Sequence, residues 1–170
     1  MLANDNQEMF PLLELPPRFH GSAMTFWVLN RRLVGLIAPD QPYIVISITN
    51  PGLVPATIRD NPNLLGVLRL QFHDTGDSHQ PLRDEVVMTE QEARSILDFV
   101  IEYRDQARVI VCQCEAGVSR SAAIAAALSR WLNHDDAFFF ANYQPNRRAY
   151  HLMETAIAEE DSSAAADASA

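Results

Sequence analysis

The segment that most constrains this chain is the heptad at residues 114–120, which reads CEAGVSR. It follows residues 108–112 (RVIVC), a β-branched run with the length of a buried strand, and precedes residues 121–133 (SAAIAAALSRWLN), which are rich in helix formers. A loop between a strand and a helix points its backbone N–H groups at one place, where the helix dipole also favours negative charge. The sequence therefore predicts an anion-binding loop.

The residue types in this loop suit a phosphoryl group under nucleophilic attack. Cys114 stands next to a predicted helix N-terminus, a position that can lower a cysteine pKa to roughly 3.5–7.5. Arg120 can fork two N–H bonds onto two phosphate oxygens. Gly117 allows a turn where a Cβ would crowd the ligand or the backbone. Ser121 can offer its hydroxyl to the Cys114 sulfur and stabilise it as a leaving group.

Residues 114–121 resemble the signature of the cysteine-dependent protein tyrosine phosphatases, most closely the dual-specificity branch, whose loop commonly reads Cys-x-x-Gly-x-Ser-Arg-Ser. Pro145-Asn146 before the last helix and the strand-like run at 43–49 (YIVISIT) are similar to features of that branch. The resemblance covers about residues 25 to 157. It implies a cysteinyl-phosphate on Cys114 and no metal or cofactor. The implied phosphate-binding residues are Glu115, Ala116, Gly117, Val118, Ser119 and Arg120.

The resemblance also implies a general acid, an Asp on the loop after the strand that precedes the long helix. Residues 65–72 run into His73 and Asp74, which places Asp74 at the matching position. Asp77 and Asp84 lie in the same loop and remain alternatives, as do His73 and the absence of any acid. A carboxyl group there would protonate the departing oxygen, because an alkoxide or phenolate leaves slowly unaided.

Two positions depart from the family pattern. The family usually has His immediately before the nucleophile, whereas this chain has Gln113, whose amide can hydrogen-bond the loop backbone but carries no positive charge. The departure predicts a less acidic Cys114 and activity that is weak or shifted to higher pH. Arg148 stands where the family often has Gly.

The patterning predicts an α/β fold with alternating strands and helices. Strands are expected at 43–49, 65–72 and 109–113, and a helix at 89–104 begins with the capping box of Thr89 and Glu92. Such alternation, like the resemblance, implies a phosphatase-like sandwich with a central, largely parallel sheet flanked by helices on both faces. Ligands then bind beyond the carboxyl ends of the strands.

Length and composition indicate one domain. At 170 residues we expect an irregular lead-in over 1–23, a catalytic domain over 24–160 and a disordered tail over 161–170. Two cysteines and the lack of a long apolar run favour a cytoplasmic protein. The net charge of −9 disfavours nucleic acid and anionic membranes as partners. A phosphorylated protein or a small phosphate ester is the expected substrate, and the sequence does not specify an oligomeric state.

Two other classes of function remain open. The first is a phosphate-recognition module that binds a phosphorylated partner without turnover, for which Gln113 and the uncertain acid are the motivation. The second is a thiol redox protein that uses Cys112 and Cys114, although Cys112 is better explained as a core residue, since a disulfide between these positions would be strained. Arg147 and Arg148 could equally guide a phosphate or solvate a helix start.

Overall fold

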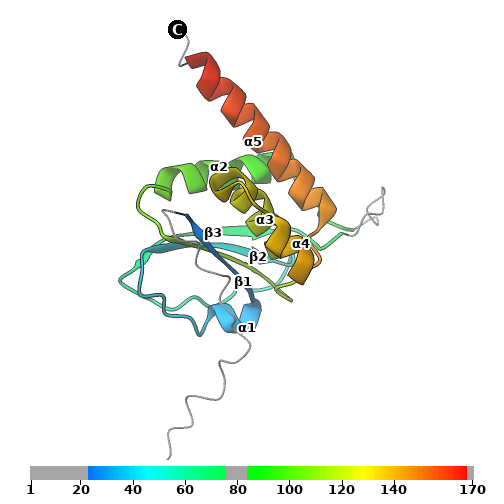
Figure 1. Cartoon of the computed structure of the whole chain (residues 1–170). Helices are drawn as coiled ribbons and strands as arrows, with labels where there is room; N and C mark the ends of the chain where they lie inside the picture. Colours follow the sequence, from blue (N-terminus) through cyan, green and yellow to red (C-terminus); the bar gives the residue numbers. More distant parts are fainter. Residues whose placement is uncertain (1–22, 76–83, 168–170) are drawn as a thin grey trace, which may run out of the picture.

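The computed structural model in Figure 1 describes residues 23–75 and 84–167, with no side-chain detail at 167. Within these residues a sheet of four parallel strands has the order β1-β4-β2-β3. The strands are β1 (Thr25–Asn30), β2 (Tyr43–Thr49), β3 (Leu64–Gln71) and β4 (Val109–Cys114).

Helices cover both faces of the sheet, but unequally. The helices are α1 (Arg31–Val34), α2 (Glu90–Tyr103), α3 (Arg120–Asn133), α4 (Ala137–Asn142) and α5 (Arg147–Asp167). Figure 1 shows α2 to α5 on one face and the short α1 on the other. The predicted α/β sandwich with a parallel sheet is therefore confirmed, and α1 is the sole helix on its second face in the described chain.

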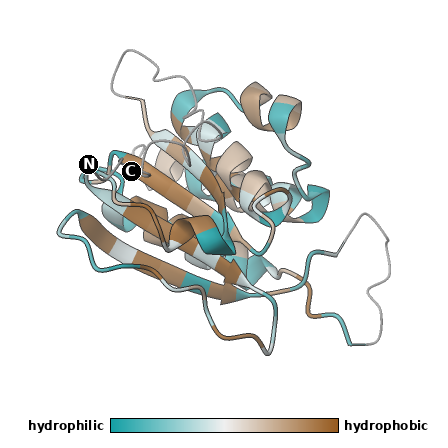
Figure 2. Ribbon diagram, turned by 90° about the horizontal axis from the view of Figure 1, so that it is seen from below, coloured by the Kyte–Doolittle hydropathy of each residue, from teal (hydrophilic) through white to brown (hydrophobic). Residues whose placement is uncertain are grey.

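The two central strands, β2 and β4, show the burial expected of strands in a parallel sheet. Every residue of β2 and β4 is buried, which is typical of parallel strands covered on both faces. In Figure 2 the strands are predominantly hydrophobic, whereas hydrophilic residues lie mainly in the connecting loops and on the helices. The larger core cluster lies under α2, α3 and α5, and a second cluster that includes Val34, Val45 and Val111 lies on the α1 side.

Helix α3 is the element that brings the anion-binding loop onto the sheet. Its residues 120–129 are all buried, because small alanine side chains let the helix pack closely on β1, β2 and β4. Helix α2 begins at the predicted capping box, in which the Thr89 hydroxyl accepts from the Glu92 backbone and Glu92 accepts from the Thr89 backbone.

All four described strands direct their carboxyl ends toward the same edge of the sheet, since they are parallel. The residues that follow those ends are Arg31 after β1, Asn50 after β2, Phe72 after β3 and Glu115 after β4. Ligands of open α/β folds bind at this edge. Its loops therefore supply the candidate site.

Over residues 161–167 the C-terminal segment differs from the prediction of a disordered tail, while residues 168–170 lie outside the described residues. Helix α5 continues through residue 161 to Asp167, and residues 161–166 are exposed. Alanine has the highest helix propensity, and extending an existing helix does not require a new nucleus. The predicted lead-in lies outside the described residues except for Ala23, and the division into domains stays a prediction.

No helix among residues 23–75 and 84–167 combines the length and the apolar character needed to cross a membrane.

Candidate active site

The loop between β4 and α3 places Cys114 at the last position of the strand and Arg120 at the first position of the helix. Gly117 makes this turn possible, because its φ is 68° and a Cβ there would lie 2.5 Å from the Asn30 backbone nitrogen. Only glycine tolerates both the left-handed backbone and the contact with the end of β1. Gly117 therefore allows the loop to pack closely against the end of β1.

Hydrogen bonds converge on the Cys114 sulfur. The Gly117 amide donates to Sγ at 3.3 Å, and the Ser121 Oγ lies 3.1 Å from it, as the sequence predicted. Burial opposes ionisation of this thiol, but the hydrogen bonds from the Ser121 side chain and backbone and from Gly117, together with the charge of Arg120, lower the pKa of Cys114 below its ordinary value. The environment of the Cys114 thiol therefore favours its ionised form.

Arg120 is 3% exposed and is held by neutral oxygens. Its Nη1 donates to the Asn50 Oδ1 at 2.7 Å and to the Phe72 carbonyl at 2.6 Å, while its buried Nε has no partner in the described structure. Both of these acceptors are uncharged, since one is a side-chain amide oxygen and the other is a backbone carbonyl. A buried guanidinium whose described hydrogen-bond partners are all uncharged favours an anion, which would supply the opposite charge and accept from Nε.

Asp74 lies beside the loop. Its Oδ1 accepts from the Ser119 hydroxyl and from the Asn146 amide, each at 2.8 Å, and the side chain remains exposed. Asn146 also donates to the Thr75 carbonyl and caps α5 by accepting from the Ala149 amide. The structure therefore brings Asp74 to the loop that carries Cys114.

The alternative acids are placed differently. Asp77 lies outside the described residues, and Asp84 is exposed without a hydrogen bond to the loop among those described. His73 has a structural role, because its backbone N–H donates to the Val86 carbonyl at 2.7 Å and its Nδ1 accepts from the Val86 amide at 3.0 Å. Among the candidate acids that the structure describes, Asp74 is therefore the one that hydrogen-bonds a residue of the loop.

We expected the Gln113 amide to hydrogen-bond the loop backbone, but its described side-chain partner lies elsewhere. Its Oε1 accepts from the Ser47 hydroxyl at 2.6 Å, across the β2–β4 register, and its buried Nε2 has no partner in the described structure. The lowered pKa of Cys114 is therefore set by other groups.

Cys112 is fully buried in the core, and burial, with a smaller effect of Cys114, raises the pKa of its thiol.

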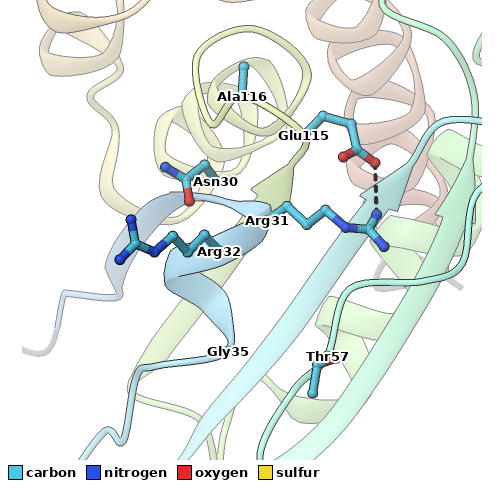
Figure 3. Close-up of a pocket in the computed structure, with 7 residues that line it drawn as sticks. All are labelled: Asn30, Arg31, Arg32, Gly35, Thr57, Glu115 and Ala116. Atoms are coloured by element: carbon cyan, nitrogen blue, oxygen red, sulfur yellow. Dashed lines mark hydrogen bonds and ion pairs between the residues drawn. The ribbon is translucent and has the colours of Figure 1, made fainter.

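The side chain of Glu115 lies against Arg31. Its Oε1 accepts from the Arg31 Nη1 at 3.1 Å and from the Asn50 backbone amide at 3.3 Å. Figure 3 shows this ion pair beside a pocket that is also lined by Ala116 of the loop and by Arg32 and Thr57. The volume of the pocket is about 560 Å³. Arg31 also donates to the Val54 carbonyl.

Arg148 has a structural contact, since its Nε and Nη2 each lie 3.3 Å from the Met88 carbonyl before α2.

The sequence did not predict that Asn50, Arg31 or the Phe72 carbonyl would contact the loop residues. The available signal was that Asn50 directly follows a firmly predicted strand, at the edge where the loop also lies. No group of three or more His, Cys, Asp or Glu residues that could hold a metal ion occurs in the described part of the chain.

The sequence matches no family model and no curated protein sequence. Solved structures do match. Human DUSP28 has a TM-score of 0.53 and 15% identity over 84% of this chain and 97% of its own. A mouse putative dual specificity phosphatase complexed with zinc tungstate has a TM-score of 0.53 and 17% identity over 85% and 87% of the two chains. This chain has the phosphatase fold of the dual-specificity branch.

PTPMT1 in complex with PI(5)P is also similar, with a TM-score of 0.51 and 14% identity over 85% of this chain and 97% of that one. At these identities the likeness establishes the fold. The resemblance that the loop signature predicted, to the cysteine-dependent protein tyrosine phosphatases nearest the dual-specificity branch, is thereby confirmed at the level of the fold.

Proposed function

We propose that this protein is a phosphoric monoester hydrolase that acts through a cysteinyl-phosphate on Cys114. The observation that carries the proposal is the buried Arg120, whose Nε has no partner among the described residues, beside a thiol whose pKa is lowered. An oxyanion bound to Arg120 and the loop amides would place its phosphorus next to the Cys114 sulfur. Charge stabilisation would then come from groups fixed in advance by the fold.

The reaction would take two steps. The Cys114 thiolate attacks phosphorus, the bond to the leaving oxygen breaks, and Asp74 donates a proton to that oxygen. Water then attacks the cysteinyl-phosphate, Asp74 accepts its proton, and the sulfur leaves as a thiolate stabilised by the Ser121 hydroxyl 3.1 Å away. Both steps use residues of this chain and require neither a metal nor a cofactor.

The substrate would be a phosphorylated protein or a small phosphate ester. The solved structures with tungstate and with PI(5)P show oxyanion and phosphoinositide complexes for those proteins and agree with this substrate class. The net charge of −9 requires local attraction, which Arg120 supplies within the loop.

The direct test is hydrolysis of p-nitrophenyl phosphate by the wild-type protein with and without a chelator. We expect turnover that is unchanged by the chelator, inhibited by vanadate and abolished in Cys114→Ser. Hydrolysis at the wild-type rate by Cys114→Ser would refute the covalent mechanism.

A second candidate is a phosphate-recognition module without turnover. Gln113 in place of the usual His favours it, as does the use of the Asp74 Oδ1 in two hydrogen bonds. In that case the wild-type protein would bind vanadate through the loop but would not hydrolyse the ester.

A further inference from the structure

We propose that Asn50, Glu115 and Arg31 form a positioning relay that holds the Arg120 guanidinium in its anion-binding orientation. The proposal rests on the proposed function in so far as Arg120 binds the phosphoryl group. The relay residues follow the carboxyl ends of three different strands, β2, β4 and β1. Hydrogen bonds connect them in sequence from the cavity of Figure 3 to Arg120.

Asn50 makes the contact that orients Arg120. Its Oδ1 accepts from Nη1 at 2.7 Å, and the Phe72 carbonyl accepts from the same nitrogen at 2.6 Å, so the two hydrogens of Nη1 are used. The Nε–H, which has no partner in the described structure, stays available for an anion. The guanidinium is therefore held through Nη1, and its Nε can donate to a bound anion.

The chemical type of residue 50 matters as much as its position. A carboxylate at 2.7 Å from Nη1 would hold the guanidinium at least as firmly, but it would also neutralise the charge that attracts a phosphoryl group. An amide oxygen orients the guanidinium without cancelling its charge. Asn50 therefore orients the Arg120 guanidinium and leaves its positive charge available to the phosphoryl group.

Glu115 holds Asn50 in turn. Its Oε1 accepts from the Asn50 backbone amide at 3.3 Å, which fixes the start of the segment after β2. Arg31 pairs with the same oxygen at 3.1 Å and its backbone amide donates to the Glu115 carbonyl at 3.3 Å. Because Arg31 offsets the charge of Glu115, a carboxylate can lie in the phosphate loop with less repulsion of the substrate.

The test compares vanadate binding by direct titration with p-nitrophenyl phosphate kinetics. Asn50→Ala should weaken vanadate binding by roughly tenfold to a hundredfold, which is the effect of one hydrogen bond to a charged group. Asn50→Asp should keep the orientation and still lose affinity through charge. Glu115→Ala should weaken vanadate binding by less than Asn50→Ala, and Glu115→Gln, which retains the accepting oxygen, should be close to wild type.

Asn133→Ala is a matched control. Asn133 makes two hydrogen bonds with the backbone of Met24 at the opposite end of α3 from the loop, so its loss should affect thermal stability alone. A double-mutant cycle separates positioning from general destabilisation: in an Arg120→Lys background, which lacks the fork, Asn50→Ala should cost much less than it does alone.

Equal losses for Asn50→Ala and Asn133→Ala, or full additivity with Arg120→Lys, would overturn the relay. A wild-type protein that binds vanadate without hydrolysing the ester would refute the hydrolase, while an Asn50→Ala defect in that binding would still support the relay. No vanadate binding by the wild-type protein would overturn both. If Asn50→Ala does not fold, Glu115→Ala and Asn50→Asp carry the same test.

Discussion

At the scale of single residues, burial raises the pKa of Cys114, and the hydrogen bond with the Ser121 hydroxyl makes the largest of the contributions that lower it. Ser121→Ala should therefore raise this pKa and reduce the thiolate fraction near neutral pH. The midpoint of iodoacetamide alkylation against pH measures it, and the midpoint should move upward. An unchanged midpoint would mean that the backbone amides and Arg120 suffice.

The same shift has a consequence for stability. The folded pKa of Cys114 lies below its unfolded value, so the thiolate contributes stability above the unfolded pKa, and this contribution is lost as the pH falls through the folded pKa. Urea unfolding at several pH values should show this loss in the wild-type protein and a smaller one in Ser121→Ala. Equal pH dependence in the two proteins would contradict the role given to the hydroxyl.

Asp74 is tested through the leaving group. Asp74→Ala removes proton donation, so an alkyl phosphate should lose about 10²–10⁴ in kcat, whereas p-nitrophenyl phosphate, with its activated phenol, should lose much less. Asp84→Ala is the matched control from the same connection and should change neither rate. Equal losses of Asp74→Ala on both substrates would assign the proton transfer to another residue.

Gln113 and Ser47 form a buried pair that leaves the Gln113 Nε2 without a partner in the described structure. Removing one member of such a pair leaves the other buried without a partner, which lowers the free energy of unfolding by about 1–3 kcal/mol. Replacing both members with apolar groups leaves the stability nearly unchanged. Ser47→Ala combined with Gln113→Met should therefore be more stable than Ser47→Ala alone. Chemical denaturation measures this, and simple additivity of the two changes would contradict the pairing.

The spacing of Cys114, Gly117, Arg120 and Ser121 was enough to predict that these residues lie together, because a single loop carries all four. Their role as an active site stays a prediction. Asn50 could not be assigned a role in the same way, since its contact with Arg120 joins segments 70 residues apart. Gln113 illustrates the same limit: the sequence specified its amide, but only the β2–β4 register determined that Ser47 would be its partner.

At the scale of elements, strong local signals were sufficient. The capping box set the start of α2, and the apolar run at 43–49 became β2 with the predicted bounds. Helix α1 was not predicted, because four residues are too few to show a period, and its start depends on the Asn30 side chain accepting from the Leu33 amide. The exposed turns of α5 after residue 161 were predicted as disordered because they contain no core-forming residue.

The junction of the loop with β1 depends on Gly117. Gly117→Ala would meet both an unfavourable φ of 68° and the Asn30 backbone, whereas Gly52→Ala has a φ of 82° but nothing within 4 Å of the new Cβ. Both should lose about 1–2 kcal/mol from left-handed backbone strain. Gly117→Ala should lose more in urea unfolding and should also weaken vanadate binding. Equal effects in the two variants would contradict a specific contact with β1.

At the scale of the whole molecule, helix α5 joins the helical layer through its first four turns. Met153 and Ala156 are buried in the core that α5 shares with α2 and α3, and Figure 1 shows the end of α5 extending beyond those helices. Two polar contacts mark the limit of this packing. The Arg94 Nη2 donates to the Glu160 Oε2 at 2.6 Å, and the Trp131 Nε1 donates to the Asp161 Oδ1 at 3.2 Å.

A chain that ends at Ser163 keeps the buried part of α5 and both polar contacts. Because residues 161–166 are exposed, this truncation should change the free energy of unfolding by no more than about 0.5 kcal/mol, as for surface positions, and should leave p-nitrophenyl phosphate hydrolysis unchanged. A chain that ends at Thr155 loses buried Ala156 and the partners of Arg94 and Trp131, so its thermal unfolding midpoint should fall by several degrees. Equal midpoints for the two truncations would mean that α5 stabilises the fold through its first two turns alone.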